Sequence, residues 1–163
     1  MNKSIRTLLL GLTLTTFVPV HAQNSPDVEK GVRALAADMK RAFDARDVTA
    51  VMANYGKPEG LHVWGGTNHT LDSIKARIET VWSDRTSESW KQDKVDVLAL
   101  SNNTALLQIT WSGRYTLKSG AIWEYKSTSF STYLVRKVGN TWKIVASHES
   151  ARGTQVNAAA KKE

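Results

Sequence analysis

One pattern in the last third of the chain strongly constrains the fold. Residues 132–138 form a strand-like run, Gly139-Asn140 follows, and a second strand-like run occupies residues 141–150. Glycine at the first central position of a two-residue loop suits a tight hairpin whose twist matches that of its strands. The chain is therefore predicted to finish as two paired antiparallel strands.

Three helices are predicted in the first half of the chain. Ser25 can cap the first, which carries an apolar stripe at helical spacing; Asp47 can cap a short second helix, and Thr70 can start a third. A short strand is expected at residues 61–64, between the second and third helices. The stripe of the first helix comprises Val28, Val32, Leu35, Ala36, Met39, Ala42 and Phe43.

From Trp90 onward the apolar period changes to two, which is typical of strands. Turn signals at Asn102-Asn103 and Ser119-Gly120, together with the final hairpin, divide this region into a four-stranded antiparallel meander. The predicted order is ααβαββββ. This is an α+β fold in which a curved antiparallel sheet wraps around three helices as a cone.

The final strand resembles that of a known superfamily. Its Trp142-x-Ile144-Val145-x-x-His148-x-Ser150 run is similar to the last hairpin of the nuclear transport factor 2-like (SnoaL-like) superfamily, in its domains of unknown function. The resemblance implies the cystatin-like cone and extends over the mature domain. It leaves the chemistry open, because this superfamily includes isomerases, dehydratases, hydrolases and association domains.

The N-terminus has the pattern of a secretory signal. Lys3 and Arg6 precede a leucine-rich run, and small residues stand at the expected positions before a cleavage site after Ala22. We expect a signal peptide at residues 1–22, a SnoaL-like domain at 23–150 and a flexible tail at 151–163. The protein is expected to be periplasmic or secreted, with no membrane contact after signal removal, and N-terminal sequencing should find Gln23 first.

Composition and motifs exclude several classes of function. The net charge is +7, but its lysines and arginines are scattered, so no nucleic-acid surface is expected. The chain has no cysteine, no glycine-rich nucleotide loop and no nucleophile elbow. His62, His69 and His148 lack the compact spacing of a metal site. No cofactor and no metal are predicted.

Two ionisable residues are candidate catalytic groups. If Asn102-Asn103 is a simple two-residue turn, Asp96 pairs with Ile109 and points inward, where poor solvation would raise its pKa toward that of a general acid or base. The other reading leaves Asp96 hydrated at the sheet margin or turned outward by a bulge. A strict final hairpin likewise turns His148 inward, whereas a single bulge turns Glu149 inward instead.

Aromatic residues supply the candidate ligand-binding set. The odd-numbered residues 105–117 form the apolar face of one strand, and aromatic side chains gather on it and its neighbours. Such residues can line the mouth of an apolar pocket, although a core role for most of them is also open. The candidates are Trp64, Trp111, Tyr115, Trp123, Tyr125 and Tyr133; Trp82 and Trp142 are expected to be packing residues.

Two functions are compatible with these residues. One is a binding module for a small, largely apolar molecule, and the other is a cofactor-independent lyase or isomerase using Asp96 or His148 as the base. The superfamily's kinase association domains carry arginines where this chain has Trp111, Tyr133 and Glu149, so their type of anion pocket is not expected. The resemblance also implies a homodimer formed through the outer sheet face. Trp142, Ile144 and Ala146 would supply that face if the hairpin is not simple.

Overall fold

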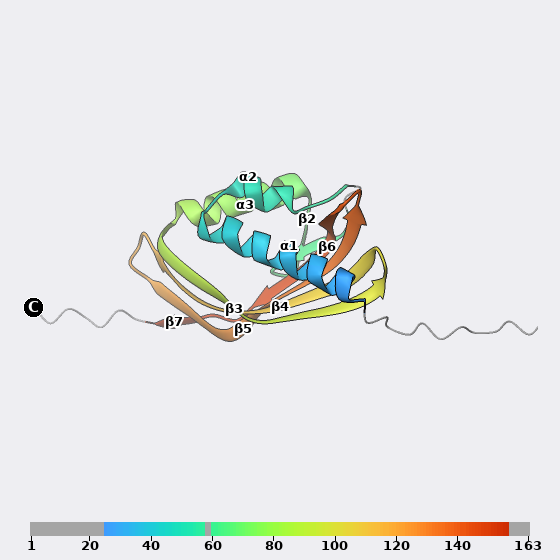
Figure 1. The fold of residues 1–163 in the computed structure, drawn as a ribbon. Helices are drawn as coiled ribbons and strands as arrows, with labels where there is room; N and C mark the ends of the chain where they lie inside the picture. Colours follow the sequence, from blue (N-terminus) through green and yellow to red (C-terminus); the bar gives the residue numbers. More distant parts are fainter. Residues whose placement is uncertain (1–24, 58–59, 157–163) are drawn as a thin grey trace, which may run out of the picture.

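The computed structural model describes residues 25–57 and 60–156. In this part of the chain a strongly curved sheet forms one layer, and three helices lie across its concave face (Figure 1). The predicted α+β class and the sheet wrapped around three helices are confirmed. The expected signal peptide lies outside the described residues, and no helix within them is long and apolar enough to cross a membrane.

The three helices occur where capping residues and apolar stripes predict them. They are α1 (Pro26–Asp44), α2 (Val48–Ala53) and α3 (Leu71–Ser83). The carboxylate of Asp47 accepts a hydrogen bond from the Ala50 amide (2.9 Å), and the Thr70 hydroxyl accepts one from the Ser73 amide (3.2 Å). Ser25 occupies the N-cap position of α1, but its hydroxyl makes no capping hydrogen bond.

The seven described strands form one sheet. The strands are β1 (His62–Trp64), β2 (Thr67–His69), β3 (Arg85–Ser101), β4 (Thr104–Leu117), β5 (Ile122–Val138), β6 (Thr141–Ala151) and β7 (Thr154–Val156). Their order is β2-β1-β6-β5-β4-β3, and β7 pairs with β5. The predicted meander is β3 to β6, whereas β1 joins β6 in parallel. Sequence analysis missed β2 and β7. A flexible tail was expected from residue 151 onward, but residues 154–156 form β7 and pair with β5.

The final hairpin has the predicted turn. Val138 pairs with Thr141, and Gly139 has a φ of +60°, a left-handed conformation that glycine adopts without a steric cost.

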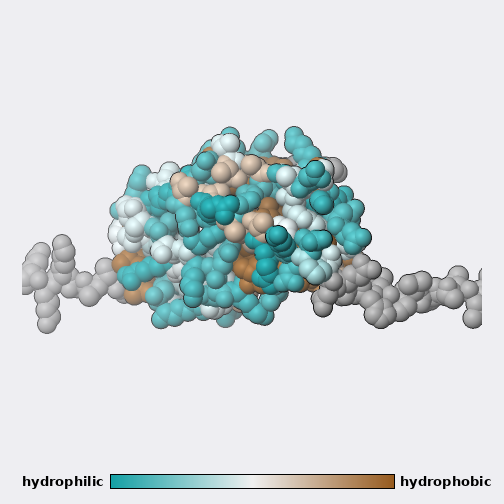
Figure 2. Space-filling view, viewed as in Figure 1, coloured by the Kyte–Doolittle hydropathy of each residue, from teal (hydrophilic) through white to brown (hydrophobic). Residues whose placement is uncertain are grey.

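The surface over the helices is mostly hydrophilic, with apolar residues in small separate groups (Figure 2).

A polar row crosses the three longest strands where the sheet bends. Register shifts occur at Asp93 in β3, near Ser112 in β4 and at the facing part of β5, and such bulges bend strands. The carboxylate of Asp93 accepts hydrogen bonds from the hydroxyls of Ser112 and Ser127, with a Ser127 distance of 2.8 Å. Both hydrogen bonds lower the pKa of the Asp93 carboxyl, and the bond from Ser112 has the larger effect. The row links three strands at the bend.

The core lies between α1 and the inner face of the sheet. The amide of Gln92 donates to the Ala36 carbonyl (3.0 Å) and the Arg33 guanidinium to the Val95 carbonyl (2.9 Å), so α1 is tied to β3. The predicted inward set of β4 is confirmed where it meets α1: Ala105, Leu107, Ile109 and Trp111 are buried.

Two residues that were expected to contribute to an outer apolar face lie in the core instead. Ile144 is fully buried, and the half-buried Trp142 packs against the same core cluster. The exposed apolar side chains on the outer sheet surface include Leu98, Leu100 and Phe130.

Candidate functional site

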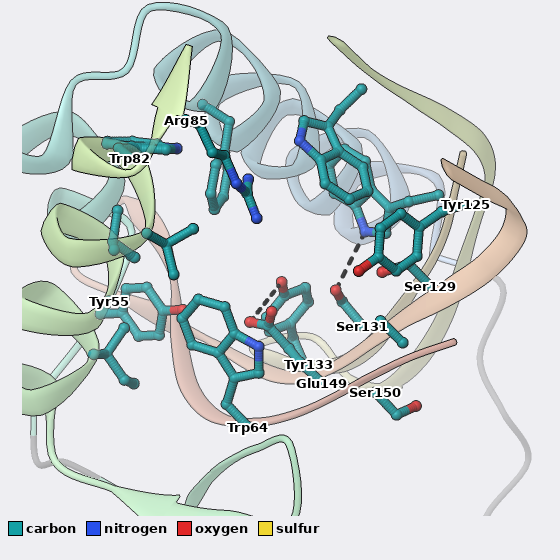
Figure 3. A pocket seen from close by; sticks show the side chains of 17 residues that line it. Tyr55, Trp64, Trp82, Arg85, Tyr125, Ser129, Ser131, Tyr133, Glu149 and Ser150 are labelled. Atoms are coloured by element: carbon teal, nitrogen blue, oxygen red, sulfur yellow. Dashed lines mark hydrogen bonds between the residues drawn. The ribbon is translucent and has the colours of Figure 1, made fainter. Parts of the chain in front are cut away.

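A cavity of about 150 Å³ lies between α3 and the inner face of the sheet. Figure 3 shows side chains from the helices, from the short strand β1 and from the long strands converging on this space. Eight of the lining side chains are aromatic, and the polar ones are few. The lining residues are Phe43, Tyr55, Trp64, Ile74, Ile78, Val81, Trp82, Arg85, Trp90, Trp111, Tyr125, Ser129, Ser131, Tyr133, Glu149, Ser150 and Ala151.

The carboxylate of Glu149 is the acidic group of the cavity. The Tyr133 hydroxyl donates a hydrogen bond to Glu149 Oε1 at 3.2 Å (Figure 3). Burial raises the pKa of the Glu149 carboxyl to about 7, against smaller lowering effects of the Tyr133 hydrogen bond and the charge of Arg77. A carboxyl group with this pKa can hold or release a proton near neutral pH.

Two tyrosines accompany this carboxylate. Burial, and secondarily the negative charge of Glu149, raises the pKa of both Tyr55 and Tyr133, so both hydroxyls remain protonated hydrogen-bond donors. Backbone hydrogen bonds fix Tyr55 beside β6: the Ile144 amide donates to the Asn54 carbonyl (2.9 Å), and the Gly56 amide donates to the Ile144 carbonyl (2.8 Å). The acid and the tyrosines are therefore held by sheet pairing.

A bulge in β6 decides which residue of the final strand faces the cavity. Leu134 pairs with Ala146 but Val135 pairs with Ile144, so Val145 is the additional residue. Beyond it Ser131 pairs with Glu149 on the inner face, while His148 pairs with Thr132 and is exposed. The prediction that His148 points inward is wrong, and the alternative with Glu149 inward is confirmed.

A second bulge moves Asp96 away from the cavity. Ser101 pairs with Thr104 across the predicted two-residue turn, but Ala99 then pairs with Ala105 and leaves Leu100 as the additional residue. Asp96 consequently pairs with Gln108 on the outer face, where its side chain is 49% exposed and lies 2.9 Å from the Lys94 ammonium. The prediction that Asp96 points inward is wrong, and its proposed catalytic role has no geometric support.

The candidate aromatic residues divide into two groups. Trp64, Trp111, Tyr125 and Tyr133 line the cavity, whereas Tyr115 and Trp123 do not. Tyr115 instead packs behind the wall, with its ring 6.0 Å from that of Tyr125. Trp82, expected to serve packing, also lines the cavity.

Tyr55, Arg85 and Trp90 are lining residues that the sequence analysis did not single out. Trp90 could have been found from its neighbour in β4, because a methyl carbon added at Gly113 would lie 2.2 Å from the Trp90 ring. The missing side chain at Gly113 thus makes room for an indole on the inner face. Arg85 and Tyr55 carry no comparable signal in the sequence.

Histidines contribute no metal centre in the described ranges. His62 is buried, and its Nδ1 lies 2.9 Å from the Ser147 hydroxyl. Residues 25–57 and 60–156 contain no group of three or more histidine, aspartate or glutamate side chains able to hold an ion.

Comparison with solved structures gives the same fold at low identity. A provisionally named aromatic ring hydroxylase from Novosphingobium aromaticivorans superposes with a TM-score of 0.71 and 15% identity, covering 82% of this chain and 96% of that chain. A provisionally named scytalone dehydratase from the same organism superposes with a TM-score of 0.68 and 13% identity, covering 83% of this chain and 91% of that chain. A hexachlorocyclohexane dehydrochlorinase from Novosphingobium barchaimii superposes with a TM-score of 0.69 and 10% identity, covering 80% of this chain and 91% of that chain.

Further matching structures carry nuclear transport factor 2-like or cystatin-like names, several without a known function. No curated protein matches the chain. Residues 32–152 match the family model described as the SnoaL-like domain, a range that begins within α1 and includes the meander and every residue that lines the cavity. The chain therefore belongs to the SnoaL-like family of the nuclear transport factor 2-like superfamily.

Proposed function

We propose that the cavity binds a small, mainly apolar molecule with about the bulk of one six-membered ring. Its volume of about 150 Å³ supports this size, because an engineered cavity of the same volume in another protein holds benzene. The aromatic walls supply apolar contact area, and a few polar groups can orient a ligand. The observation that carries the proposal is an aromatic cavity with a single acid–tyrosine pair in its wall.

Benzamide is a suitable probe because it combines one ring with a neutral polar end. We expect calorimetry to detect its binding, and Trp64→Ala to weaken that binding at least tenfold by removing one wall. Trp123→Ala is the matched control, since Trp123 is a partly buried tryptophan of the same sheet that does not line the cavity. Equal losses in the two variants, or no binding to the wild type, would reject the proposed site.

A second candidate function is proton abstraction by Glu149. The observation that favours it is a carboxyl group with a pKa of about 7 in an aromatic cavity, because a general base works best when its pKa is near the operating pH. The hydroxyls of Tyr133 and Tyr55 could stabilise negative charge that develops on a substrate. Among the structural neighbours, a dehydratase and a dehydrochlorinase have names that describe eliminations, which supports a lyase or isomerase reaction of this kind.

Ring opening of a nitrobenzisoxazole tests this chemistry without knowledge of the natural substrate. A base removes one carbon-bound proton, the electron pair cleaves the N–O bond, and a coloured phenolate forms. The rate should rise with pH as Glu149 ionises near pH 7 and level off above it. Glu149→Gln should abolish the enzymatic rate, whereas Asp96→Asn, a change on the outer face, should preserve it. A rate equal to that of buffer would remove the catalytic candidate.

A further inference from the structure

The wall of the cavity carries an excess of positive charge at the start of β3. Arg85 Nη1 donates to Glu88 Oε2 at 2.5 Å, and Arg46 Nε donates to Glu88 Oε1 at 3.0 Å. Two guanidinium groups thus share one carboxylate, whose side chain is only 8% exposed. Because Glu88 balances one of the two positive charges, this cluster of Arg46, Arg85 and Glu88 has a net charge of +1.

Arg85 is the member of this cluster that reaches the cavity. Its side chain is 14% exposed, and Figure 3 shows the guanidinium pointing into the space between the helices and the sheet. The guanidinium carbon lies 3.9 Å from the centre of the Tyr115 ring, within the range of a cation–π interaction. A guanidinium has five N–H donors, so the bond to Glu88 leaves others for a ligand.

The arginine and the carboxyl group of the cavity wall therefore lie at two separate places. Arg85 begins β3, Glu149 lies near the end of β6, and two strands stand between them in the sheet. Aromatic rings occupy much of the wall between these groups, among them Trp90, Trp111 and Tyr125. A ligand held by Arg85 would place its apolar part on these rings and its far edge toward Glu149.

We propose that Arg85 binds the carboxylate of the ligand, and that the ligand class is small single-ring acids, for which benzoate is the simplest probe. Arginine suits this role because its planar fork matches the two oxygens of a carboxylate. The assignment rests on the proposed function of the cavity, and it adds a charge requirement that the aromatic walls alone do not impose.

Benzoate and benzamide test the charge requirement because they share shape and size. We expect calorimetry at pH 6, where Glu149 is mainly protonated, to give at least tenfold tighter binding of benzoate. In Arg85→Gln the affinity of benzoate should exceed that of benzamide by less than twofold. Arg114→Gln is the control, because it removes the same charge from an exposed position of β4 that does not line the cavity.

The outcomes separate the two proposals. Equal affinity for the two probes, or a benzoate preference that survives in Arg85→Gln, overturns the role of Arg85 and leaves the apolar binding function standing. Failure of both probes to bind overturns both. If Arg85→Gln does not fold, Arg85→Lys serves instead, since it keeps a cation beside Glu88 but loses the planar fork. Its benzoate preference should fall at least threefold, and an unchanged preference overturns the inference.

Discussion

Glu149→Gln should make the protein less sensitive to pH in a defined range. Glutamine keeps the size of the side chain and can still accept the hydrogen bond from Tyr133, but it cannot ionise. In the wild type, burial raises the pKa of Glu149 from its ordinary value of 4.5 to about 7 in the folded state. The folded protein therefore holds this proton more tightly than the unfolded chain does.

The size of the effect follows from proton linkage. Between pH 4.5 and about 7 the unfolded chain has lost the proton and the folded protein retains it, so the free energy of unfolding falls as pH rises. At about 1.4 kcal/mol for each pH unit, the wild type loses about 3 kcal/mol over this interval relative to the variant. Above pH 7 the carboxyl is ionised in both states, and the difference stays constant.

Denaturant unfolding at half-unit steps from pH 4 to 8.5 measures this quantity. Subtracting the variant's free energies from those of the wild type cancels the contributions of all other titrating groups, including Asp93. The difference should decline between pH 4.5 and 7 and then become flat. Parallel curves would show that Glu149 is solvated in the folded state, and the argument from burial would fail.

Three further predictions concern packing and assembly. Leu107→Ala should lower the free energy of unfolding by about 2 to 5 kcal/mol, because Leu107 is fully buried, whereas Thr110→Ala on the outer face should cost much less; equal losses in denaturant melts would contradict the face assignment. Gly113→Ala should displace the Trp90 indole and weaken benzamide binding at least fivefold, and unchanged calorimetry would show that Trp90 does not shape the cavity. The outer sheet face, where Leu98 is 47% exposed, is proposed to form a homodimer; sedimentation should detect it, Leu98→Lys should dissociate it, and a wild-type monomer at high micromolar concentration would refute it.

Local signals in the sequence were sufficient for most of the architecture. Capping residues placed α2 and α3, the stripe of α1 matched its buried face, and Gly139 placed the last turn. The short strands β2 and β7 were missed because three residues carry no periodic pattern. The general position of the cavity followed from the inward set of β4.

The ionisable residues of the site could not be assigned because they depend on strand register. In β3 both alternating sets near the turn are apolar: Val95, Val97 and Ala99 on one face, Leu98 and Leu100 on the other. Hydrophobic alternation therefore does not fix the register, and the bulge at Leu100 reverses the face of Asp96. The bulge at Val145 similarly places Glu149 rather than His148 on the inner face. Nothing in the local composition distinguishes a bulged strand from a regular one.

The side-chain N–H signals of the six tryptophans provide the most direct test of the cavity as a binding site. Trp64, Trp82, Trp90 and Trp111 line it, whereas Trp123 and Trp142 do not. In a nitrogen–proton correlation spectrum, addition of benzamide should shift the four lining signals and leave the other two in place. Shifts confined to Trp123 and Trp142, or no shift at saturating benzamide, would contradict the claim that this cavity holds the ligand.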